Sequence, residues 1–381
     1  MKGIRCILLT LLVSLTAFAY AREIPSVEVH EDGTVTFRYC GNAKKVKLQA
    51  DFLYVGEDSS DYTDHSKHLR MRKDSTGCFS VTTRPIVPET YTYCFRIDGK
   101  RKPDPLNPDT AWQKLHLWNV FTVGGTPKTD LYLQPEVQGH IDEMWWYSTG
   151  EKQNRRVNIY VPAAYDSVGE PLDVLYLIHG INGYEGSWTE RGRAIQIMEN
   201  MVAQGRCKPM LIVMPDVNHG AHEDAASLHT MWNSVMHYPK QKRAHYVEDA
   251  IIELIHDVDT SYNVSGRNAI AGLSDGARVA ANVAMLDPGA FYAVGMFSPV
   301  IPKNQTPQDS TLLRCSIDGC VMYSVFIGKS DMFYGRCKKM HKRMEAAGLK
   351  HRYTEMGGGH YWRTWRECLI RFLDQIGEEQ Q

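Results

Sequence analysis

The sequence predicts an α/β domain preceded by a small immunoglobulin-like β-sandwich. Residues 23–125 alternate apolar and polar side chains between turn signals, which is typical of short antiparallel strands. From about residue 140, continuous apolar runs alternate with amphipathic segments, which is typical of a doubly wound parallel sheet. A chain of 381 residues is too long for one ordinary domain and suits a small module followed by a larger one.

Residues 1–21 have the pattern of a cleavable secretion signal. Lys2 and Arg5 precede an apolar run, and Ala19-Tyr20-Ala21 supplies a small-x-small cleavage site. No lipobox follows, and no later stretch reaches the roughly 18 apolar residues that cross a bilayer. We therefore expect cleavage after Ala21 and a soluble protein that is periplasmic or secreted.

The charge balance argues against two classes of partner. The chain has 43 Lys and Arg against 44 Asp and Glu, and signal removal takes two of the basic residues. The small acidic excess gives no electrostatic footprint for nucleic acid or an anionic membrane. A neutral or weakly charged substrate is expected.

The cysteines permit disulfides but suggest no metal centre. Cys315 and Cys320 flank a turn-like "SIDG" and are the pair that the spacing favours. For the other cysteines of the mature chain, disulfides and buried free thiols both stay open. None has Cys-x-x-Cys zinc spacing.

In the early region each strand is predicted from its alternation. Residues 26–40 predict a hairpin around Asp32-Gly33, and residues 44–50 alternate again. Residues 77–99 predict two more strands, and the proline-rich residues 98–110 predict the loop at which the sandwich ends. Trp112 and Trp118 are interpreted either as a sugar platform or as packing against the following domain.

The later region alternates predicted strands and helices. Strands are predicted at residues 156–165, 172–180, 210–216, 268–272, 292–299, 321–328 and 351–356. Amphipathic helices are predicted at residues 246–262 and 362–376, because apolar side chains recur there at helical spacing. This second domain is assigned to residues 140–378.

The stretch "NAIAGLSDGARVA", residues 268–280, carries the chemistry. It places Ser274 between Gly272 and Gly276, after an apolar strand and before an alanine-rich helix. This is the context of the nucleophile elbow of an α/β-hydrolase, in which a serine occupies a sharp strand-to-helix turn. A serine hydroxyl needs a neighbouring base before it becomes a useful nucleophile.

The acid and the base are expected later in the chain, in the order serine, acid, histidine. Asp331 follows the apolar run that ends "SVFIG", and His360 follows three glycines just before the last helix. The histidine would take the serine proton, and the carboxylate would orient the imidazole. Asp318 and Asp257 are the rival acids.

The oxyanion requires two backbone N–H donors. In "YLIHGINGYEGSW" a strand ends at His179-Gly180, so that the N–H of Ile181 can face the substrate carbonyl, and Asp275 supplies the second N–H. Tyr184 and Trp188, beside this loop, are candidates for stacking on an aromatic acyl group or a sugar.

Six blocks resemble, in order, the signature blocks of the esterase D and feruloyl esterase group, carbohydrate esterase family 1: "VLYLIHGINGYEGSW", "LIVMPD", "NAIAGLSDGARVA", "FSP", "FIGKSD" and "GGGHYWRTWRECLIRFL". The early region resembles the glycogen-binding-like β-sandwich that precedes such esterases. The resemblance implies an esterase for acylated plant polysaccharide that needs no cofactor. It implies Ser274, Asp331 and His360 as the triad, with the backbones of Ile181 and Asp275 as oxyanion donors.

Two features depart from the family pattern. Asp275 stands where the family usually has an apolar residue, and Ala277 where it has glycine. A carboxylate at Asp275 is harmless if it turns toward solvent or toward Arg278, and costly if it faces the oxyanion. Residues 216–246 hold five histidines without a metal-binding spacing. We interpret this segment as a cap over the acyl pocket, lined by Trp232 and Met236, with no metal.

The sequence thus predicts an exported serine esterase that cleaves feruloyl or acetyl esters on plant polysaccharide. One alternative is a siderophore-type or general acyl esterase, which cationic side chains around the pocket would favour. Another is a catalytically inactive carbohydrate-binding homologue. Acyl transfer to a second sugar is a further variant of the same chemistry.

Overall fold

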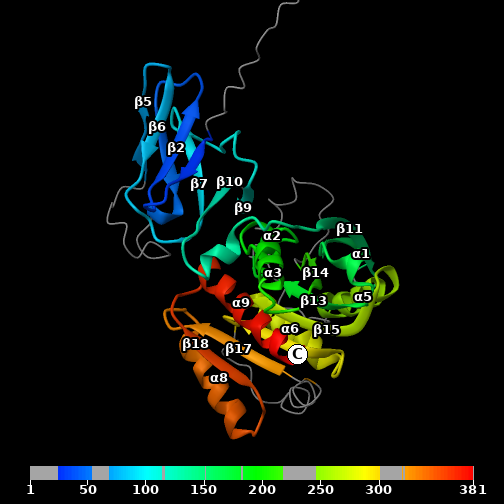
Figure 1. Cartoon of the computed structure of the whole chain (residues 1–381). Coiled ribbons are helices and arrows are strands. Elements are labelled where there is room, and N and C mark those ends of the chain that lie inside the picture. Colours follow the sequence, from blue (N-terminus) through cyan, green and yellow to red (C-terminus); the bar gives the residue numbers. More distant parts are fainter. Residues whose placement is uncertain are drawn as a thin grey trace, which may run out of the picture.

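Strands β1 to β10 of the computed structural model form a β-sandwich of two sheets (Figure 1). The structure describes residues 25–53, 68–113, 116–150, 152–181, 183–217, 246–300, 320 and 322–380. One sheet has the order β1 (Val27–Val29), β2 (Val35–Cys40), β6 (Cys78–Thr82), β5 (Arg72–Lys73). The other has the order β4 (Leu69–Arg70), β3 (Val46–Ala50), β7 (Glu89–Ile97), β10 (His116–Val123), β9 (Thr110–Gln113), and β8 (Lys100–Lys102) pairs with β7. Short 3-10 turns η1 (Asp51–Leu53) and η2 (Thr129–Tyr132) follow β3 and β10.

The hairpin predicted around Asp32-Gly33 is confirmed, with β1 and β2 antiparallel and Gly33 at a positive φ of 78°. The prediction that residues 98–110 are the loop that ends the sandwich is wrong. This stretch contains β8, and β9 and β10 follow it in the second sheet. The three prolines of this stretch lie between β8 and β9, where they interrupt the alternation that a strand would show.

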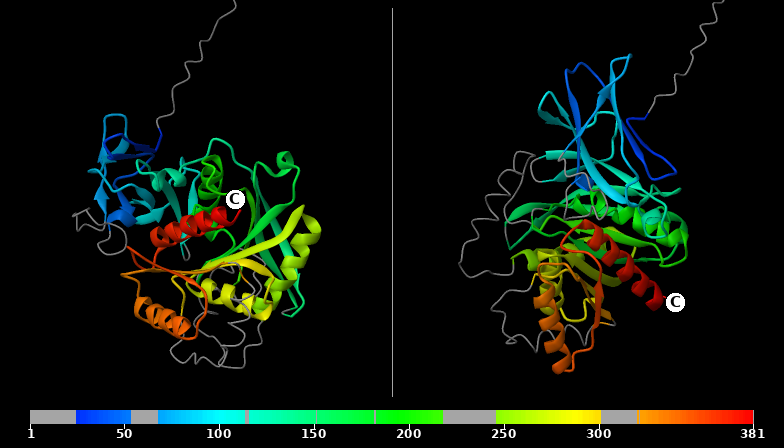
Figure 2. Two further views of the ribbon diagram at one scale, coloured as in Figure 1. Left: turned by 60° about the horizontal axis from the view of Figure 1, so that its bottom comes forward. Right: turned by 90° about the vertical axis from the view of Figure 1, so that its left-hand side faces the viewer.

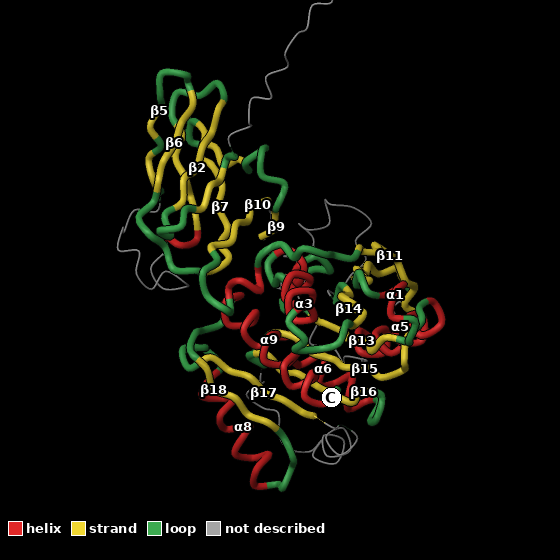
Figure 3. The backbone as a smooth tube through the Cα atoms, viewed as in Figure 1, coloured by secondary structure: helices red, strands yellow, loops and turns green. Residues whose placement is uncertain are grey.

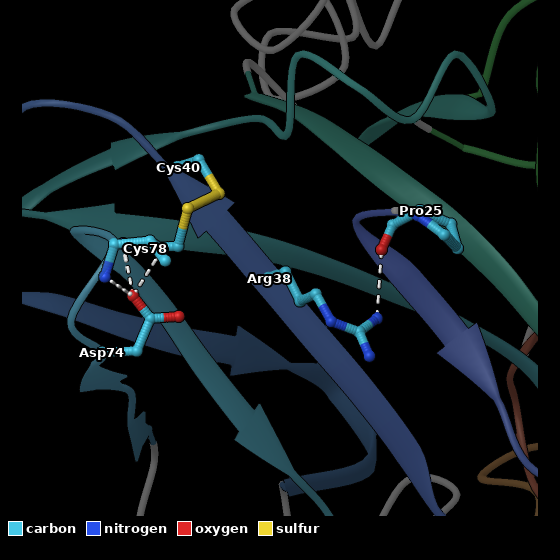
Figure 4. The surroundings of a disulfide bond; sticks show 6 residues. Pro25, Arg38, Cys40, Asp74 and Cys78 are labelled. Atoms are coloured by element: carbon cyan, nitrogen blue, oxygen red, sulfur yellow. Dashed lines mark hydrogen bonds between the residues drawn. A yellow bond between two sulfur atoms is a disulfide. The ribbon is translucent and has the colours of Figure 1, made fainter. Parts of the chain in front are cut away.

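One disulfide joins the neighbouring strands β2 and β6. Cys40 and Cys78 face one another in register and are bonded, as Figure 4 shows. Cys320 is a free thiol, so its predicted pairing with Cys315 is wrong; Cys315 itself lies outside the described residues. Burial raises the pKa of the Cys320 thiol to about 11, which suppresses its reactivity.

The sandwich core is aromatic. The ring of Phe37 packs edge-on against Tyr93 and Phe121, with centroids 5.0 and 5.2 Å apart. Phe52 and Tyr91 complete the cluster from η1 and β7. Rings from both sheets therefore close the space between them.

The large, eight-stranded sheet is mostly parallel. Its order is β11 (His140–Ser148), β12 (Gln153–Val161), β14 (Met210–Pro215), β13 (Leu172–Ile178), β15 (Val264–Leu273), β16 (Phe291–Phe297), β17 (Met322–Gly328), β18 (Arg352–Met356). Strands β13 to β18 pair in parallel, and β12 is antiparallel to both β11 and β14. The predicted strands of this region are all present.

Helices cover both faces of this sheet (Figure 2). The described helices are α1 (Tyr165–Val168), α2 (Ser187–Glu190), α3 (Ala194–Ala203), α5 (Tyr246–Ser261), α6 (Asp275–Leu286), α8 (Tyr334–Ala346) and α9 (Trp362–Glu379). Apolar side chains of α5, α6 and α8 pack on one face, and those of α3 and α9 on the other. The tube in Figure 3 shows α9 lying across the sheet near α3. Among the described helices, none is both long and apolar enough to cross a membrane.

Ion pairs connect the sandwich to elements that pack on the large sheet. The carboxylate of Glu89, at the start of β7, is fully buried and lies 2.9 Å from Arg366 and 3.3 Å from Arg363, both in α9. Asp109, just before β9, accepts two hydrogen bonds from Arg193, at 3.1 and 2.8 Å. These contacts hold the sandwich against the loops that begin α3 and α9.

Candidate active site

The turn between β15 and α6 carries Ser274. This residue has φ 56° and ψ −118°, a conformation that L-residues rarely adopt and that protein surroundings must hold in place. Its N–H donates to the carbonyl of Phe297 at 2.8 Å, and its own carbonyl accepts from Val300 at 3.2 Å. The end of strand β16 and the chain just after it therefore hold the turn by hydrogen bonds to both its N–H and its carbonyl.

The two glycines around Ser274 are required by close backbone contacts. A Cβ on Gly276 would lie 2.2 Å from the carbonyl oxygen of His179, at the end of β13. A Cβ on Gly272 would lie 2.4 Å from the carbonyl oxygen of Gly276. The spacing that marked this stretch in the sequence thus has a steric cause.

Asp331 lies in the turn after β17, with its carboxylate fully buried. Its Oδ1 accepts a hydrogen bond from the N–H of Phe333 at 2.8 Å. Burial opposes ionisation, but the hydrogen bonds from His360 and Phe333 outweigh it and lower the pKa of this carboxyl. Asp331 is therefore ionised at neutral pH.

His360 lies between Asp331 and Ser274. Its Nδ1 is 2.9 Å from Oδ2 of Asp331, and its Nε2 is 2.9 Å from Oγ of Ser274. In the neutral imidazole, Nδ1–H donates to the carboxylate and Nε2 accepts the serine proton. Phe333 and Trp365 pack edge-on against the ring, each with its centroid 5.1 Å away. The imidazole is held in one orientation.

Gly328 at the end of β17 and Gly358 before His360 let the two loops lie against one another. A Cβ on Gly328 would be 2.3 Å from the carbonyl of Gly358, which itself has φ 99°. The N–H of Ser330 donates to that same carbonyl at 2.9 Å. The loop of the histidine and the turn of the acid are thus bonded directly. Of the rival acids, Asp257 lies on the exposed side of α5, and Asp318 lies outside the described residues.

The loop after β13 passes close to the serine. A Cβ on Gly180 would lie 3.1 Å from Cβ of Ser274, and Gly183 N–H donates to the Gly180 carbonyl at 3.0 Å. His179 Nδ1 is 2.8 Å from that carbonyl, while its Nε2 accepts from Val217 N–H at 3.0 Å. The buried imidazole of His179 therefore ties this loop to the end of β14, a positioning role that sequence reasoning missed although the residue directly precedes Gly180.

The first turn of α6 begins at Asp275, whose N–H has no partner within the helix. The Asp275 carboxylate pairs with Arg278, three residues on, with Nε–Oδ1 at 2.8 Å and NH2–Oδ2 at 3.2 Å. The sequence left open whether the Asp275 carboxylate turns toward solvent or toward Arg278, either of which would spare the oxyanion. In the structure it turns toward Arg278.

Comparison with known proteins identifies the family. Residues 148–376 match the family model named Esterase. The chain belongs to the esterase family. The bifunctional "Endo-1,4-beta-xylanase/feruloyl esterase" of Xylanibacter ruminicola is 27% identical over 321 residues, covering 80% of this chain and 41% of that protein. This esterase thus spans less than half the length of that curated relative.

Solved structures share the fold at low sequence identity. A ferulic acid esterase superposes with a TM-score of 0.52 and 23% identity, covering 64% of this chain and 99% of that one. The ferulic acid esterase of Anaeromyces mucronatus gives 0.54 and 19%, covering 72% and 99%. The enterobactin esterase of Shigella flexneri gives 0.57 and 17%, covering 93% and 96%. The fold is that of the α/β-hydrolase esterases.

The residues predicted to contact the substrate of this esterase lie in different surroundings. Trp188 is 1% exposed, and its indole N–H donates to the carbonyl of Ile178 at 3.1 Å, so its ring belongs to the core and is closed to a ligand. Trp232 and Met236 lie outside the described residues. The hydroxyl of Tyr184 donates to the carboxylate of Glu190 in α2.

Glu190 was not anticipated from the sequence. Its Oε2 also accepts from the backbone N–H of Trp112 in β9, at 2.9 Å. Burial raises its pKa to about 7, although the hydrogen bonds from Tyr184 and Trp112 act in the opposite direction. One carboxyl thus connects the sandwich to the loop that follows β13. Trp118, the other tryptophan considered as a sugar platform, is buried beneath Arg101.

Proposed function

We propose that this chain is a carboxylic ester hydrolase that cleaves acyl esters, feruloyl or acetyl, on plant polysaccharides through a Ser274–His360–Asp331 triad. The observation that carries the proposal is the continuous chain of two 2.9 Å contacts from Ser274 Oγ through the imidazole to the buried carboxylate. It stands at a strained strand-to-helix turn, as a nucleophile elbow requires.

The mechanism follows from these positions. Ser274 attacks the ester carbonyl while Nε2 of His360 takes its proton, and ionised Asp331 stabilises the imidazolium. The N–H groups of Ile181 and Asp275 receive the oxyanion. The imidazolium then donates its proton to the departing alcohol of the sugar. Water, activated by the same imidazole, releases the acid from the acyl-enzyme.

Substrate class and location rest on separate support. The bifunctional xylanase/feruloyl esterase relative favours an ester carried by a plant polysaccharide. Residues 1–21, proposed as a signal peptide, would export the chain, and the Cys40–Cys78 disulfide is typical of an oxidising compartment. We propose a sandwich domain over residues 23–125 and an esterase domain over residues 140–378. A glycogen-binding-like role for the sandwich stays a prediction.

Initial rates on methyl ferulate and p-nitrophenyl acetate test the proposal, with the wild type compared with Ser274→Ala. We expect Ser274→Ala to lose activity by at least about 10⁴-fold. Ser265→Ala is the matched control, because this serine lies on the same strand at its other end and bonds Asp173.

Turnover of methyl ferulate by the wild type supports an aromatic acyl pocket. Turnover of p-nitrophenyl acetate alone would support the proposed triad and indicate that the natural substrate carries a smaller acyl group than feruloyl. If neither ester is hydrolysed and a fluorophosphonate probe does not label Ser274, the result would favour the inactive carbohydrate-binding homologue.

A further inference from the structure

Two exposed aromatic rings lie on the edge strand of the large sheet. Trp145 and Tyr147 in β11 are 48% and 55% exposed, while Trp146 between them is buried against the α5 side. Because side chains alternate along a strand, both exposed rings project to the opposite face, which carries α2 and α3. Neither ring takes part in the core on that face.

The sheet register places these rings at the same edge as Ser274. One row of paired residues runs across the sheet through Ile270, Tyr176, Val213, Ile159 and Asp142. Ser274 lies four residues after Ile270, in the turn that follows β15. Trp145 lies three residues after Asp142, along β11. Strand β11 runs in the direction of β14 and β13, because β12 is antiparallel to both of its neighbours.

The lateral separation is four strand spacings, or about 19 Å at roughly 4.8 Å each. An oligosaccharide of several rings would cover this distance. The acyl group at Ser274 and a sugar further along the same chain could therefore be held together.

Trp145 is backed by charged side chains that connect it to the loop after β13, which carries Ile181, one of the two proposed oxyanion donors. The guanidinium of Arg156, its cross-strand partner, lies over the indole at 4.9 Å from the ring centroid. Arg156 NH1 also lies 3.5 Å from Oε1 of Glu185, in the loop between β13 and α2. The cation holds one ring face and fixes the indole, and the ring remains half exposed.

We propose that Trp145, backed by Arg156, is a platform that binds a sugar ring of the polysaccharide carrying the ester. The inference rests on the proposed esterase function. Sugars present apolar C–H faces and a rim of hydroxyls, which match an aromatic ring beside a guanidinium and a carboxylate. A protein partner is less suited to this surface, because the exposed Glu143 lies two residues from Trp145 on the same face.

A comparison of small and extended substrates tests the platform. For Trp145→Ala we expect kcat/KM on methyl ferulate to stay within about 2-fold, and kcat/KM on a feruloylated xylo-oligosaccharide of at least four sugars to fall about 10-fold through KM. Trp145→Tyr should recover most of the loss. Leu286→Ala is the matched control, because Leu286 is 39% exposed at the end of α6 remote from Ser274.

Binding supplies a readout that does not depend on turnover. Unesterified xylohexaose is titrated calorimetrically into the Ser274→Ala protein with and without Trp145→Ala. We expect the second substitution to weaken binding about 10-fold. Unchanged binding and an unchanged oligosaccharide KM would overturn the platform while leaving the esterase intact. An equal loss on methyl ferulate would assign Trp145 a purely structural role and also overturn it. Absence of any esterase activity would overturn the proposed function, and the titration would still decide the platform.

Discussion

Asp275 and Arg278 form a two-point ion pair within the first turn of α6. The pair matters because the N–H of Asp275 is a proposed oxyanion donor while its carboxylate has the same charge as the oxyanion. Holding the carboxylate against a guanidinium removes most of that repulsion. The charge of Asp275, which stands where the family usually has an apolar residue, is therefore compensated by Arg278, three residues further along.

Removal of Arg278 should expose this conflict. We expect Arg278→Ala to lower kcat on p-nitrophenyl acetate about 10-fold, because an unpaired carboxylate would stand beside the developing negative charge. The double variant Asp275→Asn/Arg278→Ala should recover to within about 3-fold of wild type. A double variant as slow as Arg278→Ala would show that Arg278 acts by another route, such as its contact with Glu248 at 3.4 Å.

Asp331→Asn should disable the proposed triad without disturbing the fold. An amide cannot stabilise the imidazolium and favours the wrong imidazole tautomer, so kcat should fall by about 10⁴-fold. Asp257→Asn is the control, since that rival acid lies on the exposed side of α5 and should leave kcat unchanged. Equal losses in both variants would contradict the assignment of the acid.

Gly276→Ala tests the steric explanation of the elbow. The added methyl would lie 2.2 Å from a main-chain oxygen that no rotamer change can move, so unfolding free energy should drop by about 3 kcal/mol or more. Gly335→Ala in α8 is the matched helical control. Its Cβ would meet nothing within 4 Å, and alanine should leave stability equal or up to about 1 kcal/mol higher. Urea unfolding compares the two; a tolerated Gly276→Ala would refute the steric account.

Glu190 should make stability depend on pH. Its pKa in the folded protein is raised from 4.5 to about 7, so the unfolded chain releases this proton first. Its stabilising contribution is complete below pH 4.5 and is lost as the pH rises through 7. Relative to Glu190→Gln, the wild type should lose about 3 kcal/mol of unfolding free energy over that range. Asp51, whose pKa burial raises to about 6, is present in both proteins and cancels in the difference. Parallel pH profiles for the two proteins would rule out this coupling.

Local patterns were enough to predict strands β12 to β18 and the order in which Ser274, Asp331 and His360, the proposed triad, follow one another. Strands β8 to β11 were not among the predicted strands. A Cβ at Gly272 or Gly276 would collide with main chain, so only glycine fits at either position. The packing therefore leaves a pattern that can be recognised in the sequence. The helices at residues 246–262 and 362–376 were visible because each buries one apolar face. Sequence also located His360 and Asp331, since both follow strands that end at the same edge of a parallel sheet.

Sequence by itself thus determined the fold class and the residues of the proposed triad. The tertiary structure alone decided which neighbours each polar or aromatic side chain meets. Trp188 and Tyr184 belong to one stretch of sequence, yet packing closes the first into the core and turns the second toward Glu190. Glu89 meets Arg366 across 277 residues. Periodicity reports which side of its own element a residue occupies, whereas such contacts depend on how distant elements are packed together.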